Sequence, residues 1–195
     1  ITAIDADYIR PSLACCYWIE EQGEVAIIDT GTGHTAHKIV NWMEENKISA
    51  DSVRYIIPTH VHLDHAGGTG VLMQHCSNAR LLAHPYGSRH LIDPQKLIAG
   101  TTQVYGEEKM KSYFGEILPV AADRVDEIHD GMEIKLGERV LTILDAPGHA
   151  RHHLVVWDTI SRGIFSGDTC GIAYPEFQTN DHMVLFPPAT PVQFD

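Results

Sequence analysis

The feature that most constrains this chain is a ten-residue segment, 59–68, that is crowded with metal-ligand residue types. It reads THVHLDHAGG and places, within six positions, His60, His62, Asp64 and His65. The segment follows an apolar stretch, 54–57, that is typical of a buried strand, and precedes a stretch, 70–76, that can form a helix. Because α/β folds place reacting groups at strand ends, we expect these side chains to gather at one edge of a sheet.

The segment predicts a metal site. Imidazole nitrogens and carboxylate oxygens are ligands that zinc, iron and manganese accept in catalytic sites. In an extended segment His60 and His62 point the same way and can share one ion, while Asp64 and His65 reach toward a second. The chain has 13 histidines among 195 residues, which directs attention to metal binding. A purely structural role explains the segment poorly, because four crowded polar side chains add nothing to a core.

Two further polar groups follow later predicted strands. The sequence APGH, ending at His149, comes after the apolar stretch 140–144, and SGDT, containing Asp168, comes after 163–165. Alone, each has a structural explanation, as a turn histidine or as an aspartate that ends a strand. Beside the first cluster, we expect His149 to complete a three-histidine site and Asp168 to bridge two ions.

Hydrophobic periodicity predicts strands and helices in both halves of the chain. An apolar stripe over 36–43 predicts an amphipathic helix that ends near Asn46, and 85–115 has mostly helical spacing. The remaining predicted elements are a hairpin of 13–20 with 24–28, a helix at 70–76, and strands at 54–57, 79–83, 125–128, 132–136, 140–144, 154–157 and 163–165. The tail, 174–195, contains four prolines and predicts a loop. Such mixing indicates layered α/β packing in a single domain, 1–195.

Composition narrows the range of partners. The formal net charge of −12 disfavours nucleic acid, and no apolar run is long enough to predict a membrane span. The four cysteines, Cys15, Cys16, Cys76 and Cys170, show no paired spacing. We therefore expect free thiols and a cytoplasmic protein. The first residue is Ile1, which predicts a processed form or a domain cut from a longer protein.

The segments THVHLDHAGG, APGH and FSGDT, with IIDTG upstream, resemble the metallo-β-lactamase superfamily of metal-dependent hydrolases. The match covers about residues 13–172 in the family's order and spacing. The resemblance implies an α/β fold, a four-layer αβ/βα sandwich of two mixed sheets with metals at one edge. It also implies two divalent ions, with zinc expected and iron or manganese as alternatives.

The resemblance assigns roles residue by residue. It implies that His60, His62 and His149 hold the first ion, that Asp64 and His65 hold the second, and that Asp168 bridges them. Asp29 matches an aspartate that supports the metal loop without ligating. One departure is the late histidine of two-metal members, because His182 lacks the strand and glycine that usually accompany it. We therefore expect the C-terminal part of the domain to lie outside this chain, which leaves the completeness of the second site open.

The function implied is hydrolysis of a small thioester or lactone by a metal-bound hydroxide, as in hydroxyacylglutathione hydrolases and acyl-homoserine-lactone lactonases. Asp64 would orient the hydroxide or accept its proton, and Tyr174 could donate to the oxyanion, although a loop tyrosine without a role explains it as well. Two alternatives stay open: a mononuclear-iron persulfide dioxygenase and a non-catalytic binding module. The expected partner is a small molecule, a homodimer is compatible with the sequence, and 85–115 and 174–195 are expected to shape the pocket.

Overall fold

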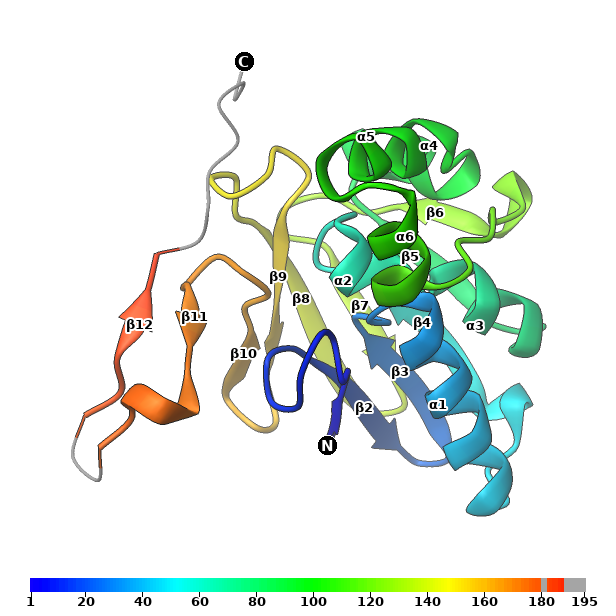
Figure 1. Ribbon diagram of the computed structural model, residues 1–195. Helices are drawn as coiled ribbons and strands as arrows, with labels where there is room; N and C mark the ends of the chain where they lie inside the picture. The colour runs from blue at the N-terminus through cyan, green and yellow to red at the C-terminus, as the bar shows by residue number, and fades with distance from the viewer. Residues whose placement is uncertain (180–181, 188–195) are drawn as a thin grey trace.

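The computed structural model describes residues 1–179 and 182–187, and two sheets packed face to face form its centre (Figure 1). The first sheet has the order β1-β2-β3-β4-β5-β6. Its strands are β1 (Thr2–Asp5), β2 (Cys15–Glu21), β3 (Glu24–Ile28), β4 (Val53–Ile57), β5 (Arg80–Ala83) and β6 (Val125–Glu127). The sheet is mixed, because β1, β2 and β3 pair antiparallel and β3 to β6 pair parallel.

The second sheet is an antiparallel meander of order β10-β9-β8-β7. Its strands are β7 (Glu133–Leu136), β8 (Arg139–Asp145), β9 (Leu154–Asp158) and β10 (Gly163–Phe165). Beyond it, β11 (Ile172–Ala173) pairs with β12 (Leu185–Phe186) in a segment that stands apart from both sheets (Figure 1).

The helices cover the outer face of the first sheet (Figure 1). They are α1 (Gly33–Glu45), α2 (Leu63–Ala66), α3 (Thr69–His75), α4 (Pro85–Ile92), α5 (Gln95–Tyr105) and α6 (Glu107–Lys109), followed by a π-helical turn at Met110–Phe114. Short 3-10 turns lie at Ala50–Ser52, Ala122–Arg124 and Pro175–Phe177. Thr32 caps α1 by accepting from the amide of Thr35, and the helix ends at Glu45 with Asn46 as its C-cap, close to the end that the periodicity predicts.

Side-chain alternation along the central strands divides the core into two layers. Ile27 and Ile56 face the helices, whereas their neighbours Ile28 and Ile57 face the second sheet. Leu141 of β8 is buried in the layer between the sheets. Both faces of β3 and β4 are therefore buried, which explains their nearly continuous apolar sequences.

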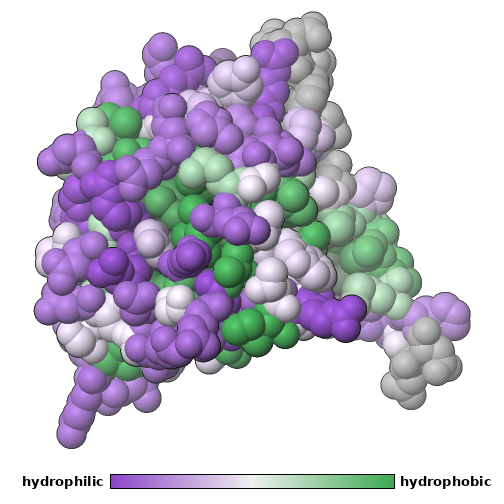
Figure 2. All heavy atoms as spheres, turned by 180° about the vertical axis from the view of Figure 1, so that it is seen from behind, coloured by the Kyte–Doolittle hydropathy of each residue, from purple (hydrophilic) through white to green (hydrophobic). Residues whose placement is uncertain are grey.

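The outer face of the second sheet is not covered by a helix within 1–179 and 182–187 (Figure 1). Leu144 and Ile164 on this face are 37% and 49% exposed. From behind, apolar side chains gather near the middle of the molecule and on the segment that carries β11 and β12 (Figure 2). The described residues thus form three of the four layers that the resemblance implies. No helix in this part of the chain is long and apolar enough to cross a membrane.

The predicted hairpin is confirmed. Gln22 and Gly23 adopt φ values of 52° and 80°, which is typical of the two-residue turns that suit the twist of paired strands. The edge strand β1 was not predicted, because four residues carry too little periodicity. The prediction of a loop over 174–195 is wrong for the two-residue strand β12 and for the 3-10 turn, and β11 lies just before that range. Residues 180–181 and 188–195 lie outside the described residues.

Candidate metal centre

The histidine segment lies between β4 and α2. After β4 ends at Ile57 the chain bends at Thr59 and His60 and reaches His62, the N-cap of α2, which is extended with φ and ψ of −62° and 145°. Asp64 and His65 then occupy the first helical turn. The extended segment expected from the sequence is therefore interrupted by a bend at His60, and a helical turn directs Asp64 and His65.

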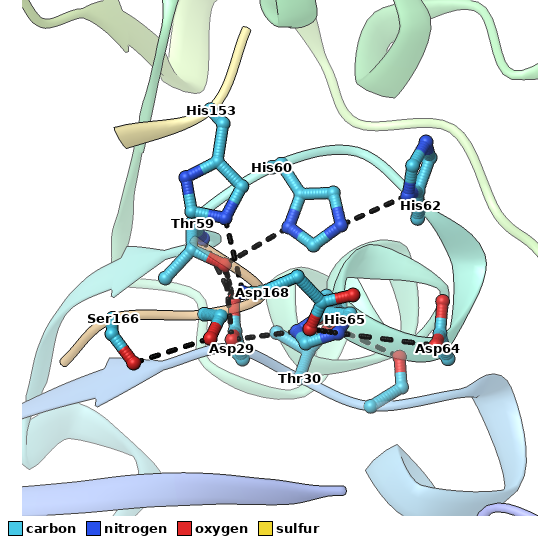
Figure 3. A network of polar contacts seen from close by, with 12 residues as sticks. Asp29, Thr30, Thr59, His60, His62, Asp64, His65, His153, Ser166 and Asp168 are labelled. Carbon is cyan, nitrogen blue, oxygen red and sulfur yellow. Dashed lines mark hydrogen bonds and ion pairs between the residues drawn. The ribbon is translucent and has the colours of Figure 1, made fainter. Parts of the chain in front are cut away.

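Asp29, at the end of β3, anchors this segment from below (Figure 3). Its carboxylate accepts from the amide of Thr59 at 2.7 Å, from the Thr59 hydroxyl at 3.0 Å and from Nδ1 of His65 at 2.9 Å. Asp29 is 3% exposed and has a φ of 56°, in the left-handed region that aspartate tolerates. Since these bonds use both oxygens, Asp29 is a support of the loop, as the resemblance implies.

Three histidine nitrogens converge on one side of the centre, here called the histidine side: His60, His62 and His149. Nδ1 of His62 lies 3.0 Å from Nε2 of His60 and 2.8 Å from Nε2 of His149. The Thr59 hydroxyl gives its proton to Asp29, so it accepts from Nδ1 of His60 at 3.1 Å. We therefore assign the lone pair of His60 to Nε2, which faces the other two rings.

Two aspartates, Asp64 and Asp168, lie around His65 on the other side of the centre. These three residues are here called the carboxylate side. Nε2 of His65 lies 3.1 Å from Oδ1 of Asp168 and 3.8 Å from Oδ2 of Asp64. The second oxygen of Asp168 lies 3.4 Å from Nε2 of His149. Asp168 therefore faces both sides at once, one oxygen toward each.

The loop that carries Asp168 needs a glycine and a histidine. Gly167 has a φ of +46°, and a Cβ there would lie 2.6 Å from the Thr59 hydroxyl and 2.8 Å from Nε2 of His153. The amide of Asp168 donates to Nε2 of His153 at 3.2 Å, while Nδ1 of His153 lies 3.1 Å from the hydroxyl of Thr169. His153 thus positions the loop that carries Asp168 (Figure 3).

The two sides differ in their electrostatics. Burial holds the pKa of His60 well below its usual range and lowers that of His62 to about 4, with neighbouring histidines adding to the effect. Burial also opposes charge on His65, but Asp29, Asp64 and Asp168 outweigh it and raise its pKa. His65 in turn lowers the pKa of Asp168 to about 2, against the opposing effect of burial. Burial thus favours the neutral forms of His60 and His62, whereas His65 and Asp168 each favour the charged form of the other.

The donor chemistry fits divalent metal ions. Two groups of donor atoms each lie within 4.8 Å of one another: His60, His62 and His149 in one, and His60, His65 and Asp168 in the other. Neutral imidazoles with converging nitrogens and ionised carboxylates are what zinc, iron or manganese requires. Five of the six predicted ligands therefore come together in these groups, and the sixth, Asp64, lies beside His65.

A cleft of about 800 Å³ opens on the carboxylate side, lined by Asp64, His65 and Asp168. Its walls are largely apolar and aromatic and include Tyr8, Leu13, Tyr17, Phe165 and Ile172. Tyr174 also lines it, with its ring 5.3 Å from that of Phe186 and the Arg10 guanidinium 5.6 Å from its centroid. A catalytic role for Tyr174 stays a prediction.

Other residues singled out from sequence lie elsewhere. His182 is exposed and pairs through its backbone with Thr179, outside both donor groups found among the described residues. The four cysteines are free, and Cys15 and Cys170 line the cleft. Sequence reasoning gave no role to Thr59, although its place between strand and first histidine was a signal. It also missed His152, which accepts from the amide of Val61 at 3.4 Å.

Comparisons with known proteins agree with this geometry. The family described as "Metallo-beta-lactamase superfamily" matches residues 10–180. A metallo-beta-lactamase fold-containing protein of Sulfurisphaera tokodaii, ST1585, is 31% identical over 124 residues, 62% of this chain and 46% of its own length. A beta-lactamase-like protein 2 homolog of Caenorhabditis elegans is 25% identical over 142 residues, 73% of this chain and 39% of its own. The chain thus spans less than half the length of these relatives.

Solved structures share the fold. The crystal structure of ST1585 superposes with a TM-score of 0.71 at 26% identity, covering 95% of this chain and 67% of that one. The subclass B3 metallo-beta-lactamase MEM-A1, from a soil metagenome library, gives a TM-score of 0.58 at 25% identity, covering 75% and 51%. Since the family match also spans most of the chain, this protein belongs to the metallo-beta-lactamase superfamily.

Proposed function

We propose that this chain is the metal-binding domain of a hydrolase that cleaves a small ester-type substrate, a thioester or a lactone. The observation that carries the proposal is the position of Asp168, which faces His149 with one oxygen and His65 with the other. His60 can serve only one ion through its single Nε2 lone pair, so with His60 beside His62 and His149, the donors left for a second divalent ion would be His65, Asp168 and the adjacent Asp64. Zinc is the expected ion, and iron and manganese accept the same ligands.

Divalent ions held by these residues would lower the pKa of a water molecule and polarise a substrate carbonyl. The protein's own contribution is to hold the donors and to handle a proton. Asp64 is half-buried at the mouth of the cleft, 3.8 Å from Nε2 of His65, where it can hold a water molecule and accept its proton. His60 and His65 are each held through Nδ1, so their rings cannot turn away from the centre.

The cleft supports a small substrate with an apolar part. Tyr8, Tyr17 and Phe165 offer aromatic surface beside Asp64, so an acyl chain or a lactone ring could lie against them. A net charge of −12 remains an argument against nucleic acid as a partner. The four free thiols fit a reducing compartment such as the cytoplasm.

Metal analysis followed by an activity panel tests the proposal. We expect about two ions per chain, and hydrolysis of a thioester or lactone that chelation abolishes and zinc restores. Phosphodiesters serve as the contrasting substrates. Fewer than about 0.1 ion per chain after purification without chelators would reject the metal centre. One iron per chain, with oxygen consumption on glutathione persulfide, would assign the dioxygenase alternative, and bound metal without turnover on any substrate would favour a binding module.

A further inference from the structure

A second, smaller pocket of about 320 Å³ opens on the histidine side of the centre. Three parts of the chain form it: Val61 and His62 from the loop after β4, His90 from α4 with Lys96 and Thr101 from α5, and His152 from the loop between β8 and β9. Figure 1 shows α4 and α5 side by side at this end of the molecule. Because His62 is part of the wall, the pocket adjoins the candidate metal centre.

The pocket is basic in an acidic protein. Lys96 is exposed and makes no ion pair within the part of the chain that the structure describes. The guanidinium of Arg89 donates to Nε2 of His90 at 3.3 Å, which brings a second cation to the rim. Within the described part of the chain, no aspartate or glutamate lines the pocket. Burial, Arg89 and Lys96 together lower the pKa of His90, as expected where cations gather without a counter-ion.

The polar groups of the pocket are mostly donors. His152 accepts from the amide of Val61 through Nδ1, so its proton is assigned to Nε2. The Lys96 ammonium can only donate, and the Thr101 hydroxyl can donate. Gly87 lets α4 pack closely on Val61, because a Cβ there would lie 2.8 Å from Cγ1 of Val61. Close packing therefore fixes the wall of the pocket, and its hydrogen-bond donors can bind a ligand that carries acceptor atoms.

We propose that this pocket binds a carboxylate of the substrate, so that the ester bond to be cleaved lies at the metal centre beside it. The inference rests on the proposed hydrolytic function and narrows its substrate class to esters with an anionic end. Lys96 would supply the charge, with Thr101 and His152 as hydrogen-bond donors. The apolar remainder of the substrate would extend into the large cleft on the carboxylate side, so the two pockets would fix its direction.

A matched pair of thioesters tests the proposal on zinc-loaded protein: the succinyl thioester, with a free carboxylate, and the uncharged butyryl thioester of the same thiol. We expect the wild-type protein to prefer the succinyl ester about 10-fold in kcat/KM, and Lys96→Gln to remove this preference through KM. Lys135→Gln is the control, because Lys135 is exposed on β7 in the other sheet and its replacement changes the net charge equally. Equal ratios in the wild type and Lys96→Gln would overturn the inference.

A binding measurement keeps this test separate from that of the proposed function. In NMR spectra of the zinc-loaded protein, glutarate should shift the amide signals of Gly100 and Thr101, with millimolar affinity typical of a small fragment. Lys96→Gln should abolish the shifts and Lys135→Gln should keep them. If no ester is hydrolysed but the shifts occur, the hydrolase proposal fails and the anion site stands. If glutarate causes no shift, or inorganic phosphate binds more tightly, the carboxylate assignment is wrong.

Discussion

The histidine side and the carboxylate side of the centre share one loop but differ in charge and in surroundings. On the histidine side, three rings converge and burial keeps His60 and His62 neutral. On the carboxylate side, Asp29, Asp64 and Asp168 outweigh the effect of burial and raise the pKa of His65. The histidine side opens on a small basic pocket, whereas the carboxylate side opens on a wide apolar cleft.

This difference shows how one centre can give a direction to its substrate. The two carboxylates, Asp64 and Asp168, lie on one side only, while the positive charge of Lys96 lies on the other. A substrate with an anionic end and an apolar end has a single favourable orientation across such a centre. Changes made to each side separately should therefore have different consequences.

Removal of a ligand on the histidine side should have the largest effect. Nδ1 of His62 is close to the ring nitrogens of both His60 and His149, and the His62 side chain makes no capping hydrogen bond to α2. We expect His62→Ala to lose about one ion per chain and about 10³-fold in kcat/KM, with a near-native Tm. Elemental analysis and calorimetry check this, with His37→Ala on exposed α1 surface as the control. A variant that keeps both ions would show that the histidine side is not a metal site.

On the carboxylate side, Asp64→Asn should cost about 10²-fold in kcat, roughly 3 kcal/mol. The amide keeps the shape of the side chain but loses the charge and the proton acceptor. The histidine side should stay loaded, so about one ion per chain, a near-native Tm and very slow turnover are expected. Near-wild-type hydrolysis by this variant would contradict any role of Asp64 in proton transfer.

Loss of the support beneath the centre should affect the two sides unequally. Asp29→Asn removes the negative charge of a carboxylate that accepts a hydrogen bond directly from His65. The same carboxylate contacts His60 only indirectly, through the Thr59 hydroxyl. We expect zinc affinity to fall about 10- to 100-fold on the carboxylate side and less on the histidine side. Zinc titration against a chelator resolves the two steps. Equal weakening of both steps would mean that Asp29 holds the whole loop as one unit.

A change in the scaffold should spare both sides. Asp158, on β9, is fully buried and pairs with Arg139, which also reaches Glu21 of the first sheet. Burial opposes its charge, but hydrogen bonds from Ser161 and Ile160 and the charge of Arg139 hold its pKa below the usual value. We expect Asp158→Asn to cost about 1.5 kcal/mol of unfolding free energy at pH 7 with unchanged metal content.

The pH dependence of this cost has a defined sign. A carboxylate whose pKa is lowered by folding stabilises the native state above its unfolded pKa of about 3.9, and loses that contribution as the pH falls toward its folded pKa. The difference between the wild type and Asp158→Asn should therefore shrink below about pH 4 in urea titrations. A constant difference from pH 7 to pH 3 would mean that packing, not charge, gives Asp158 its effect.

The sequence signals for the cluster of candidate ligands are local, and the structure brings five of these residues together. The run of apolar residues that ends at Ile57 defines a strand end, and the histidines follow within a few positions. His149 and Asp168 stand at the ends of their own strands, so one rule located all three groups. The three groups converge because two sheets pack face to face, and only the family resemblance, not the local sequence signals, predicted that packing.

What the sequence could not predict depends on distant partners. The role of Thr59 is decided by Asp29, thirty positions away, and neither residue alone signals the contact. The basic pocket arises because α4 and α5 pack against the loop that carries His62, so Lys96 looks like any surface lysine in the sequence. Strands as short as β11 and β12 have no periodicity to detect.

The donors of the centre come from opposite sheets, since His60 and His62 follow β4 whereas His149 and Asp168 follow β8 and β10. In the terms of polymer physics, an ion shared by His62 and His149 is a reversible cross-link between residues 87 positions apart. Such a link removes conformations from the open chain and favours the closed one. A chain made without metal would join its two sheets through apolar packing, hydrogen bonds and the ion pair of Arg139 with Glu21, so metal supply would decide how firmly the two sheets stay together.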